Sequence, residues 1–294
     1  MATKDCIRNP MSRVGKVSGT FILIALAILP FVAGCGDDCS ECPDPAGTSA
    51  PPFPPDGVFS ITGDGVVTVC WNQKTETNIA AYGIYRNSEP TGEYTWIADV
   101  SSSECEDGLC CYDDEEVQNG ETWWYAVTAI NDHNQESQDL SYEFVDDTPR
   151  PEDYRGLVLM DYLGQDSGRS GYDFSDLSNT ARPWNDNTTD IYFGVSNGVR
   201  FIYSTAGVEI QDYGIIDLVW VDEAPTDGWA PSGRVEAIPG HSYIVRIPVR
   251  SGPGNWNVAK FEVVSVSNAS VTMYWAYQEV VDLPELTPGG GAMR

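Results

Sequence analysis

Positive charge is scarce in this sequence. Its 294 residues include 16 Lys and Arg against 44 Asp and Glu, with only two His, which gives a formal net charge of −28 at pH 7. So acidic a chain repels the phosphate backbone, because proteins that bind nucleic acid need a basic footprint. A nucleic-acid partner is therefore excluded, and close contact with an anionic membrane surface is disfavoured.

The chain is also poor in the motifs that carry common enzyme chemistries. It has no His-Glu-x-x-His, no phosphate-cradling Gly-x-x-x-x-Gly-Lys loop and no dinucleotide fingerprint, and we expect no nucleophile elbow. No long window beyond the N-terminal region has the 3.6-residue period of an amphipathic helix. We therefore predict an all-β protein with no catalytic residue, no metal site and no cofactor.

The N-terminal region has the pattern of a secretory signal. Basic residues precede an apolar run from Phe21 to Val32, and the run ends in Leu-Pro-Phe-Val-Ala-Gly before Cys35. About 20 apolar residues are needed to span a bilayer, and this run is shorter. The motif around Cys35 resembles the lipobox of bacterial lipoproteins, which implies that this cysteine is acylated and becomes the new N-terminus.

This resemblance implies a signal peptide over residues 1–34 and an anchor of acyl chains such as palmitate on Cys35. A start at Met11 would give a signal of ordinary shape, so Met1 and Met11 both stand as candidate start residues. Gly36 differs from the aspartate associated with inner-membrane retention. We expect a protein of the bacterial cell envelope, attached to the outer membrane.

The cysteines beyond the anchor form an even set, and export to an oxidising compartment makes disulfides the expectation. The six are Cys39, Cys42, Cys70, Cys105, Cys110 and Cys111. The first two lie in a linker rich in Pro and Gly (residues 35–55), with no second pair at zinc-finger spacing, so we expect a local disulfide between them.

Residues 56–148 form runs with a period of two, separated by turn clusters. The spacing of Val67-x-Val69-x-Trp71, Tyr82-Gly83-Ile84-Tyr85 and Trp123-x-Tyr125-x-Val127 resembles a fibronectin type III domain. Alternation places Val67, Val69 and Trp71 inside the sandwich and Cys70 on its outer face. Trp123 stands where this family usually has its corner tyrosine, so we expect an altered corner hydrogen bond.

Between two of these strands lies a cysteine-rich tip. We favour a Cys105–Cys110 bond that closes the tip and a Cys111–Cys70 bond between neighbouring strands. The alternative joins Cys70 to Cys105 or to Cys110, and spacing alone leaves this open.

Residues 151–284 form a second β-rich region, followed by a flexible tail over residues 285–294. We expect strands near 156–163, 191–193, 199–204, 215–221, 242–248, 258–266 and 271–278. Segments such as Asp190-Ile191-Tyr192-Phe193 are similar to haem-scavenging lipoproteins of the HmuY type, which implies an all-β, surface-facing fold. The bis-histidine ligation of that family has no match, because His133 and His241 belong to different regions.

Two kinds of residue in the second region are candidates for binding. Acidic turns at 161–173 and 185–190 offer oxygen ligands for calcium but lack EF-hand spacing, which favours solvated turns. Trp184, Trp229 and Trp256 stand in loops rich in Gly, Pro and Asn, where they would anchor the loops or bind a ligand. We predict a non-catalytic binding or adhesion protein for an unidentified protein or polysaccharide. The alternative is a carbohydrate-active enzyme or its sugar-binding accessory module.

Overall fold

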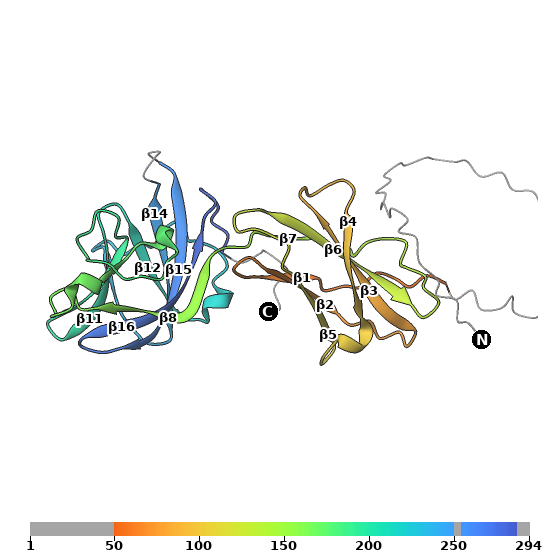
Figure 1. Ribbon diagram of the computed structural model, residues 1–294, viewed down its shortest axis with the longest axis horizontal. Helices are drawn as coiled ribbons and strands as arrows, with labels where there is room; N and C mark the ends of the chain where they lie inside the picture. The colour runs from red at the N-terminus through yellow and green to blue at the C-terminus, as the bar shows by residue number, and fades with distance from the viewer. Residues whose placement is uncertain (1–49, 250–253, 287–294) are drawn as a thin grey trace, which may run out of the picture.

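The protein is all-β, as expected. The computed structural model describes residues 50–249 and 254–286, which form two β-sandwiches placed end to end (Figure 1). Within these residues no helix is long and apolar enough to cross a membrane. The predicted signal peptide, the anchor Cys35 and the Cys39–Cys42 pair lie outside the described residues.

The first sandwich has seven strands in two antiparallel sheets, and the predicted fibronectin type III-like fold is confirmed. One sheet has the order β1-β2-β5 and the other β4-β3-β6-β7. The strands are β1 (Phe59–Thr62), β2 (Val67–Asn72), β3 (Ile79–Asn87), β4 (Thr95–Ser101), β5 (Leu109–Asp114), β6 (Trp123–Asn131) and β7 (Val145–Asp147). A 3-10 turn, η1 (Ser102–Glu104), follows β4.

The core of this sandwich follows from the alternation of β2. Val67, Val69 and Trp71 are fully buried and pack against β3, where the Trp71 and Tyr82 rings meet edge to face at 5.4 Å. The Tyr82 hydroxyl accepts a hydrogen bond from the backbone of Lys74 at 2.8 Å. The sequence-based assignment of this inner face is correct.

The corner between β5 and β6 is closed by a tyrosine, two residues after the position expected. Tyr125 is buried, and its hydroxyl donates to the carboxylate of Asp114 at 2.9 Å. Asp114 also accepts from Arg86 at 2.6 Å, and the Arg86 guanidinium lies 4.3 Å from the centre of the Trp123 ring. The corner bond is therefore made to a side chain, and Trp123 supports the arginine.

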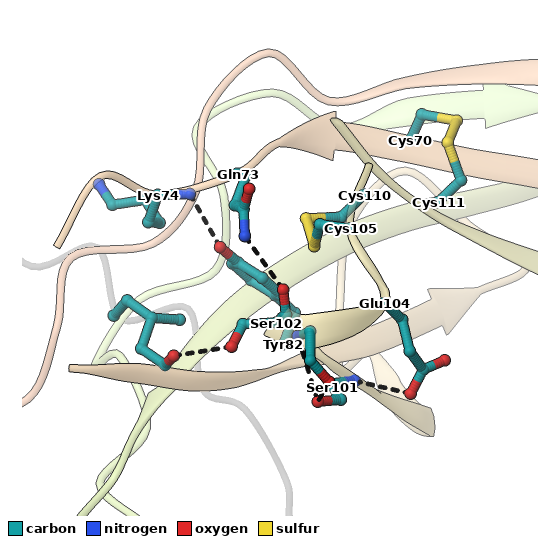
Figure 2. The surroundings of a disulfide bond; sticks show 12 residues. Cys70, Gln73, Lys74, Tyr82, Ser101, Ser102, Glu104, Cys105, Cys110 and Cys111 are labelled. Carbon is teal, nitrogen blue, oxygen red and sulfur yellow. Dashed lines mark hydrogen bonds between the residues drawn. A yellow bond between two sulfur atoms is a disulfide. The ribbon is translucent and has the colours of Figure 1, made fainter. Parts of the chain in front are cut away.

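Both favoured disulfides of the first sandwich are present: Cys70–Cys111 and Cys105–Cys110 (Figure 2). Cys110 and Cys111 are consecutive residues of β5, so their side chains point to opposite faces. Cys111 shares the outer face with its register partner Cys70, whereas Cys110 reaches into the core side and meets Cys105. Because the two side chains point to opposite faces of β5, Cys111 bonds to Cys70 and Cys110 bonds to Cys105.

The second sandwich packs a five-stranded sheet, β12-β14-β15-β16-β8, against a four-stranded sheet, β13-β11-β10-β9. The strands are β8 (Glu152–Met160), β9 (Gly171–Tyr172), β10 (Ile191–Ser196), β11 (Val199–Ser204), β12 (Glu209–Ile215), β13 (Arg234–Glu236), β14 (His241–Pro248), β15 (Trp256–Val266) and β16 (Ser270–Gln278). Short 3-10 turns are η2 (Ser167–Arg169), η3 (Phe174–Asp176) and η4 (Leu218–Trp220).

The strand expected over 215–221 is wrong, because the strand ends at Ile215 and the chain then turns over the outside of the five-stranded sheet. Val221 and Leu286 pack there against Ile244 and Val258 in a small apolar cluster. Beneath them the ammonium of Lys260 donates to the carbonyls of Val221 and Leu286, at 2.9 and 3.0 Å. The apolar residues after Ile215 therefore belong to a loop that covers the sheet. The tail that was expected to begin at residue 285 is packed against the sheet as far as Leu286.

The two sandwiches join through a buried polar segment between β7 and β8. Arg150 is buried, and its backbone N–H donates to the carbonyl of Gly63 in the first sandwich at 3.1 Å. Asp147, at the end of β7, accepts from the Thr62 hydroxyl at 2.6 Å. Burial raises the Asp147 pKa to about 6, against the opposing effects of Thr62 and Arg150.

The two disulfides are expected to differ in their contribution to stability. The Cys70–Cys111 bond spans 41 residues and the Cys105–Cys110 bond spans five. Loop-closure entropy then predicts a loss of about 4 kcal/mol for Cys70→Ala/Cys111→Ala and about 2 kcal/mol for Cys105→Ala/Cys110→Ala. Urea unfolding of both double variants measures this difference, and a larger loss for the tip pair would contradict it.

The buried Asp147 predicts a specific pH dependence. Its pKa is higher in the folded protein than in the unfolded chain, so its stabilising effect is present below about pH 4 and is lost as the pH rises through about 6. Asp147→Asn is therefore expected to gain stability relative to the wild type between pH 4.5 and pH 7, by roughly 1.4 kcal/mol per pH unit at most.

Unfolding free energies at several pH values test this expectation. Asp113→Asn is the matched control, because the exposed Asp113 also accepts from a threonine hydroxyl, that of Thr68, at 2.6 Å. A stability difference between Asp147→Asn and the wild type that stays constant with pH would refute the assignment.

Candidate functional site

Aromatic side chains cover the outer face of the four-stranded sheet in the second sandwich. Ile191 and Phe193 of β10 point into the core, so Tyr192 and Gly194 point outward. On β11 the register partner of Tyr192 is Tyr203, and the two rings are nearly parallel with centroids 4.9 Å apart. We call the side chains of Tyr162, Trp184, Tyr192, Phe201 and Tyr203 the tyrosine surface.

Tyr162 crosses the strands from outside, and a glycine makes room for it. Its ring centroid lies 5.3 Å from that of Tyr192, 5.9 Å from that of Tyr203 and 5.5 Å from that of Trp184. A Cβ added to Gly194 would lie only 2.3 Å from an atom of the Tyr162 ring. The side chain that is missing at Gly194 therefore sets the position of Tyr162.

The phenol hydroxyls of this surface are available to a ligand. None of the hydroxyls of Tyr162, Tyr192 and Tyr203 makes a hydrogen bond to another described residue. The three phenols lie together, and burial raises the pKa of Tyr192, with further contributions from the neighbouring Tyr162 and Tyr203. Each hydroxyl can donate and accept, so the surface can bind a hydroxyl-rich ligand.

A cation borders the same surface. The guanidinium of Arg234 lies 4.4 Å from the centre of the Phe201 ring and 5.9 Å from that of Tyr203. Arg234 is exposed and has no ion pair or hydrogen-bonded side-chain partner among the described residues. The tyrosine surface thus presents aromatic rings, hydroxyls and a positive charge that a ligand can reach.

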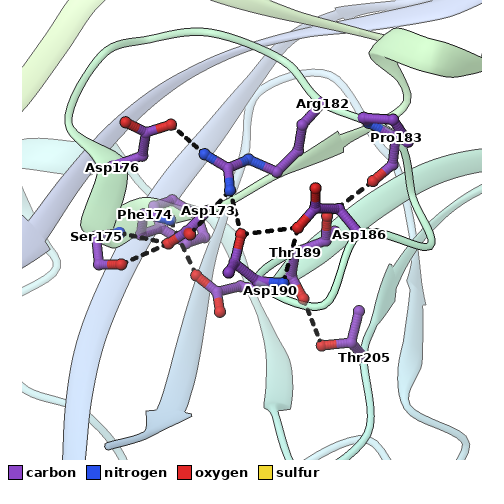
Figure 3. Close-up of polar contacts among 11 residues, drawn as sticks. Asp173, Phe174, Ser175, Asp176, Arg182, Pro183, Asp186, Thr189, Asp190 and Thr205 are labelled. Atoms are coloured by element: carbon purple, nitrogen blue, oxygen red, sulfur yellow. Dashed lines mark hydrogen bonds and ion pairs between the residues drawn. The ribbon is translucent and has the colours of Figure 1, made fainter. Parts of the chain in front are cut away.

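The two acidic turns meet around the guanidinium of Arg182 (Figure 3). Arg182 donates to Asp173 at 3.1 Å, and also to Asp176 and Thr188. Within the described part of the chain no group of three or more His, Cys, Asp or Glu is placed to hold a metal ion. The carboxylates instead fold the loop that carries Trp184.

The three candidate tryptophans do not form one surface. Trp184 is 38% exposed and belongs to the tyrosine surface. Trp229 and Trp256 lie on the outer face of the five-stranded sheet, on either side of Arg246, with the guanidinium 5.1 and 4.6 Å from their ring centres. Arg246 is also paired with Glu209 at 2.6 Å. The Arg246 guanidinium is thus held by Glu209 and by both indole rings, so Trp229 and Trp256 anchor the chain that covers the sheet.

Sequence reasoning missed the tyrosines, although the signal was present. Tyr192-x-Gly194 and Phe201-x-Tyr203 alternate with apolar core residues in two adjacent strands, which predicts an aromatic outer face. It also passed over a Gly-x-Ser-x-Gly pattern from Gly194 to Gly198. That pattern forms the β10–β11 hairpin turn, with positive φ at Asn197 and Gly198, and leads into a strand instead of a helix.

The two histidines lie in separate sandwiches. The ring Nδ1 of His133 is 2.6 Å from Asp132, and that of His241 is 2.9 Å from Asp212. Each histidine therefore has a carboxylate partner of its own. They do not come together as a ligand pair.

Comparison with known proteins gives likenesses of fold alone. No family model and no curated protein match the chain. A Fn3-like protein from Clostridium thermocellum is 23% identical over 33% of this chain and 92% of its own, with a TM-score of 0.27. A DUF4466 family protein from Parabacteroides merdae is 10% identical over 82% of this chain and 98% of its own, with a TM-score of 0.31. Pectate lyase PelI from Erwinia chrysanthemi is 18% identical, covering 30% of this chain and 27% of its own, with a TM-score of 0.25.

Proposed function

We propose that this protein is a non-catalytic binding module of the bacterial cell envelope, anchored by acyl chains on Cys35, and that its tyrosine surface binds a glycan. The observation that carries the proposal is the group of three phenol hydroxyls, exposed indole and exposed Arg234 on one sheet face. Tyr, Trp and Arg are the residue types that most often dominate binding surfaces.

The chemistry of the surface favours a sugar over an apolar ligand. An apolar ligand would remove the hydroxyls of Tyr162, Tyr192 and Tyr203 from water without replacing their hydrogen bonds, at a cost of about 1–3 kcal/mol for each group. A glycan supplies both donors and acceptors to the hydroxyls, while its C–H faces pack on aromatic rings. Tyr192, Phe201 and Tyr203 stand on paired strands, and the rings of Tyr162 and Trp184 pack against Tyr192, so most of the geometry is fixed before the ligand arrives.

The rest of the chain suits a binding module held away from a membrane. Residues 35–55 are rich in Pro and Gly and give a semi-extended spacer, and the first sandwich adds further distance. Removing residues 1–34 takes away four of the 16 basic residues and one of the 44 acidic residues, which leaves 12 against 43. This excess of negative charge keeps the chain off anionic lipid.

The anchor has a direct test. Acylation of Cys35 is expected to carry the expressed protein into the detergent phase and to add the mass of the acyl groups, because acyl chains partition into apolar surroundings. Cys35→Ala is expected to leave the protein in the aqueous phase. If wild type and variant both stay in the aqueous phase, the lipoprotein assignment is wrong.

The binding site is tested on a glycan array probed with the full chain and its variants. Trp184→Ala and Tyr192→Ala are expected to lower affinity at least about tenfold, the loss of roughly 1.4 kcal/mol typical of a contact residue. Gly194→Ala is expected to do the same by displacing Tyr162. Trp256→Ala, on the opposite face, is the matched control and is expected to bind normally.

The outcomes of this experiment separate the alternatives. Equal loss in Trp256→Ala and Tyr192→Ala would show that the tyrosine surface is not the site. Hydrolysis of an arrayed glycan would favour a carbohydrate-active enzyme. Binding only to proteins would keep the module but replace its ligand class.

A further inference from the structure

A second aromatic face lies on the first sandwich, on the outer side of the sheet β4-β3-β6-β7. Trp96 of β4 is the register partner of Tyr85 of β3, and Tyr85 is the partner of Ala126 of β6. These side chains therefore form a row across three strands. Trp124 and Tyr94 extend the cluster around Tyr85.

The far end of the row comes from the segment before β7. The Phe144 ring packs on Tyr94 with centroids 5.3 Å apart. Trp96 is 44% exposed, Phe144 40% and the nearby Tyr142 77%. We call Tyr85, Tyr94, Trp96, Trp124 and Phe144 the aromatic face; Tyr85 and Tyr94 are buried in it, so the rings that a partner can reach are those of Trp96 and Phe144. Large apolar side chains that stay exposed mark an interaction surface more often than a free one.

Carboxylates surround this face. The Trp96 indole donates to Asp99 at 2.9 Å, and the Tyr85 hydroxyl donates to Glu136 at 2.6 Å. Burial raises the pKa of Tyr94 to about 12, with a further contribution from the nearby Asp146. The aromatic face is thus a set of π surfaces within a field of negative charge.

No cation of the same sandwich neutralises this charge. Between residues 50 and 150 the described chain has three Lys and Arg residues and one His, His133, which pairs with Asp132. Lys74 pairs with Glu76, Arg86 with Asp114, and the buried Arg150 faces Glu152. The field around the aromatic face is therefore open to a cation from outside the molecule.

We propose that the aromatic face docks an extended, arginine- or lysine-rich segment of a partner protein. A guanidinium placed over the exposed ring of Trp96 or Phe144 gains cation–π attraction, and the surrounding carboxylates supply ion pairs. Neighbouring strands are about 4.8 Å apart, so the three strands beneath the face span on the order of 10 Å, the length of about three residues of an extended peptide. The first sandwich is then a binding domain in its own right as well as a spacer.

The negative charge around the aromatic face also disfavours three other candidate occupants of this face. The chain between Cys35 and Ser49 has four acidic residues and no basic one, so it is repelled from the face. A second copy of this acidic chain is disfavoured for the same reason, and so is an anionic lipid surface. A cationic protein segment is the partner whose chemistry fits.

The test uses the full chain in detergent and a synthetic peptide of alternating arginine and glycine. A control peptide carries citrulline, which is uncharged and nearly isosteric, in place of arginine. Calorimetry is expected to show binding of the arginine peptide alone. Trp96→Ala and Phe144→Ala are expected to weaken it by about tenfold, as for other contact residues. Trp220→Ala, at an exposed position of the second sandwich, is expected to have no effect.

Two outcomes would overturn the proposal. Equal binding of the citrulline peptide would remove the role of charge, and unchanged binding in both Trp96→Ala and Phe144→Ala would show general attraction to an acidic protein. Circular dichroism of each variant confirms that it is folded. The glycan test is independent of this one, because Trp96→Ala leaves the tyrosine surface intact.

Discussion

The shortage of positive charge constrains the structure, because a few cations hold the anionic or polar groups of whole segments in place. Arg86 fixes the corner between β5 and β6 through Asp114, and Arg150 lies buried where the two sandwiches join. Arg182 folds the acidic loop that carries Trp184, and Lys260 fastens the covering loop and the end of the described chain to the five-stranded sheet. These contacts are buried or partly buried, where charge-assisted hydrogen bonds are strong and the loss of one partner is costly.

The use of cations inside the fold explains why two aromatic faces differ. Both arise from strand alternation, which turns every second side chain away from the core. The tyrosine surface borders Arg234, which has no carboxylate partner in the described chain, and it has three hydroxyls free to bind a ligand. The aromatic face of the first sandwich is bordered by Asp99 and Glu136 instead. The two faces have similar geometry, but the side chains that border them carry opposite charge, so we expect them to bind ligands of different chemistry.

Periodicity was enough to predict the all-β class and the inner face of the first sandwich. Val67, Val69 and Trp71 point inward because alternation is a local property of an extended chain. The same rule explains the Cys70–Cys111 bond of the structure, since Cys110 and Cys111 point to opposite faces of β5. It failed over 215–221, where Val221 is buried by a loop crossing the outside of a sheet. A short apolar run has the same pattern in a strand and in such a loop.

The sequence by itself determined the strand class, the fibronectin-like pattern and the expectation of disulfides that Cys70, Cys105, Cys110 and Cys111 fulfil, because these depend on neighbouring residues and composition. Only the tertiary structure decided which aromatic residues share a face. Trp184 joined Tyr162 and Tyr192, while Trp229 and Trp256 stacked on Arg246 across the sandwich. The tertiary structure also decided that the carboxylates of the acidic loop bind the guanidinium of Arg182. Both outcomes depend on the register between strands and on loops that are distant in sequence, and a single sequence does not specify that register.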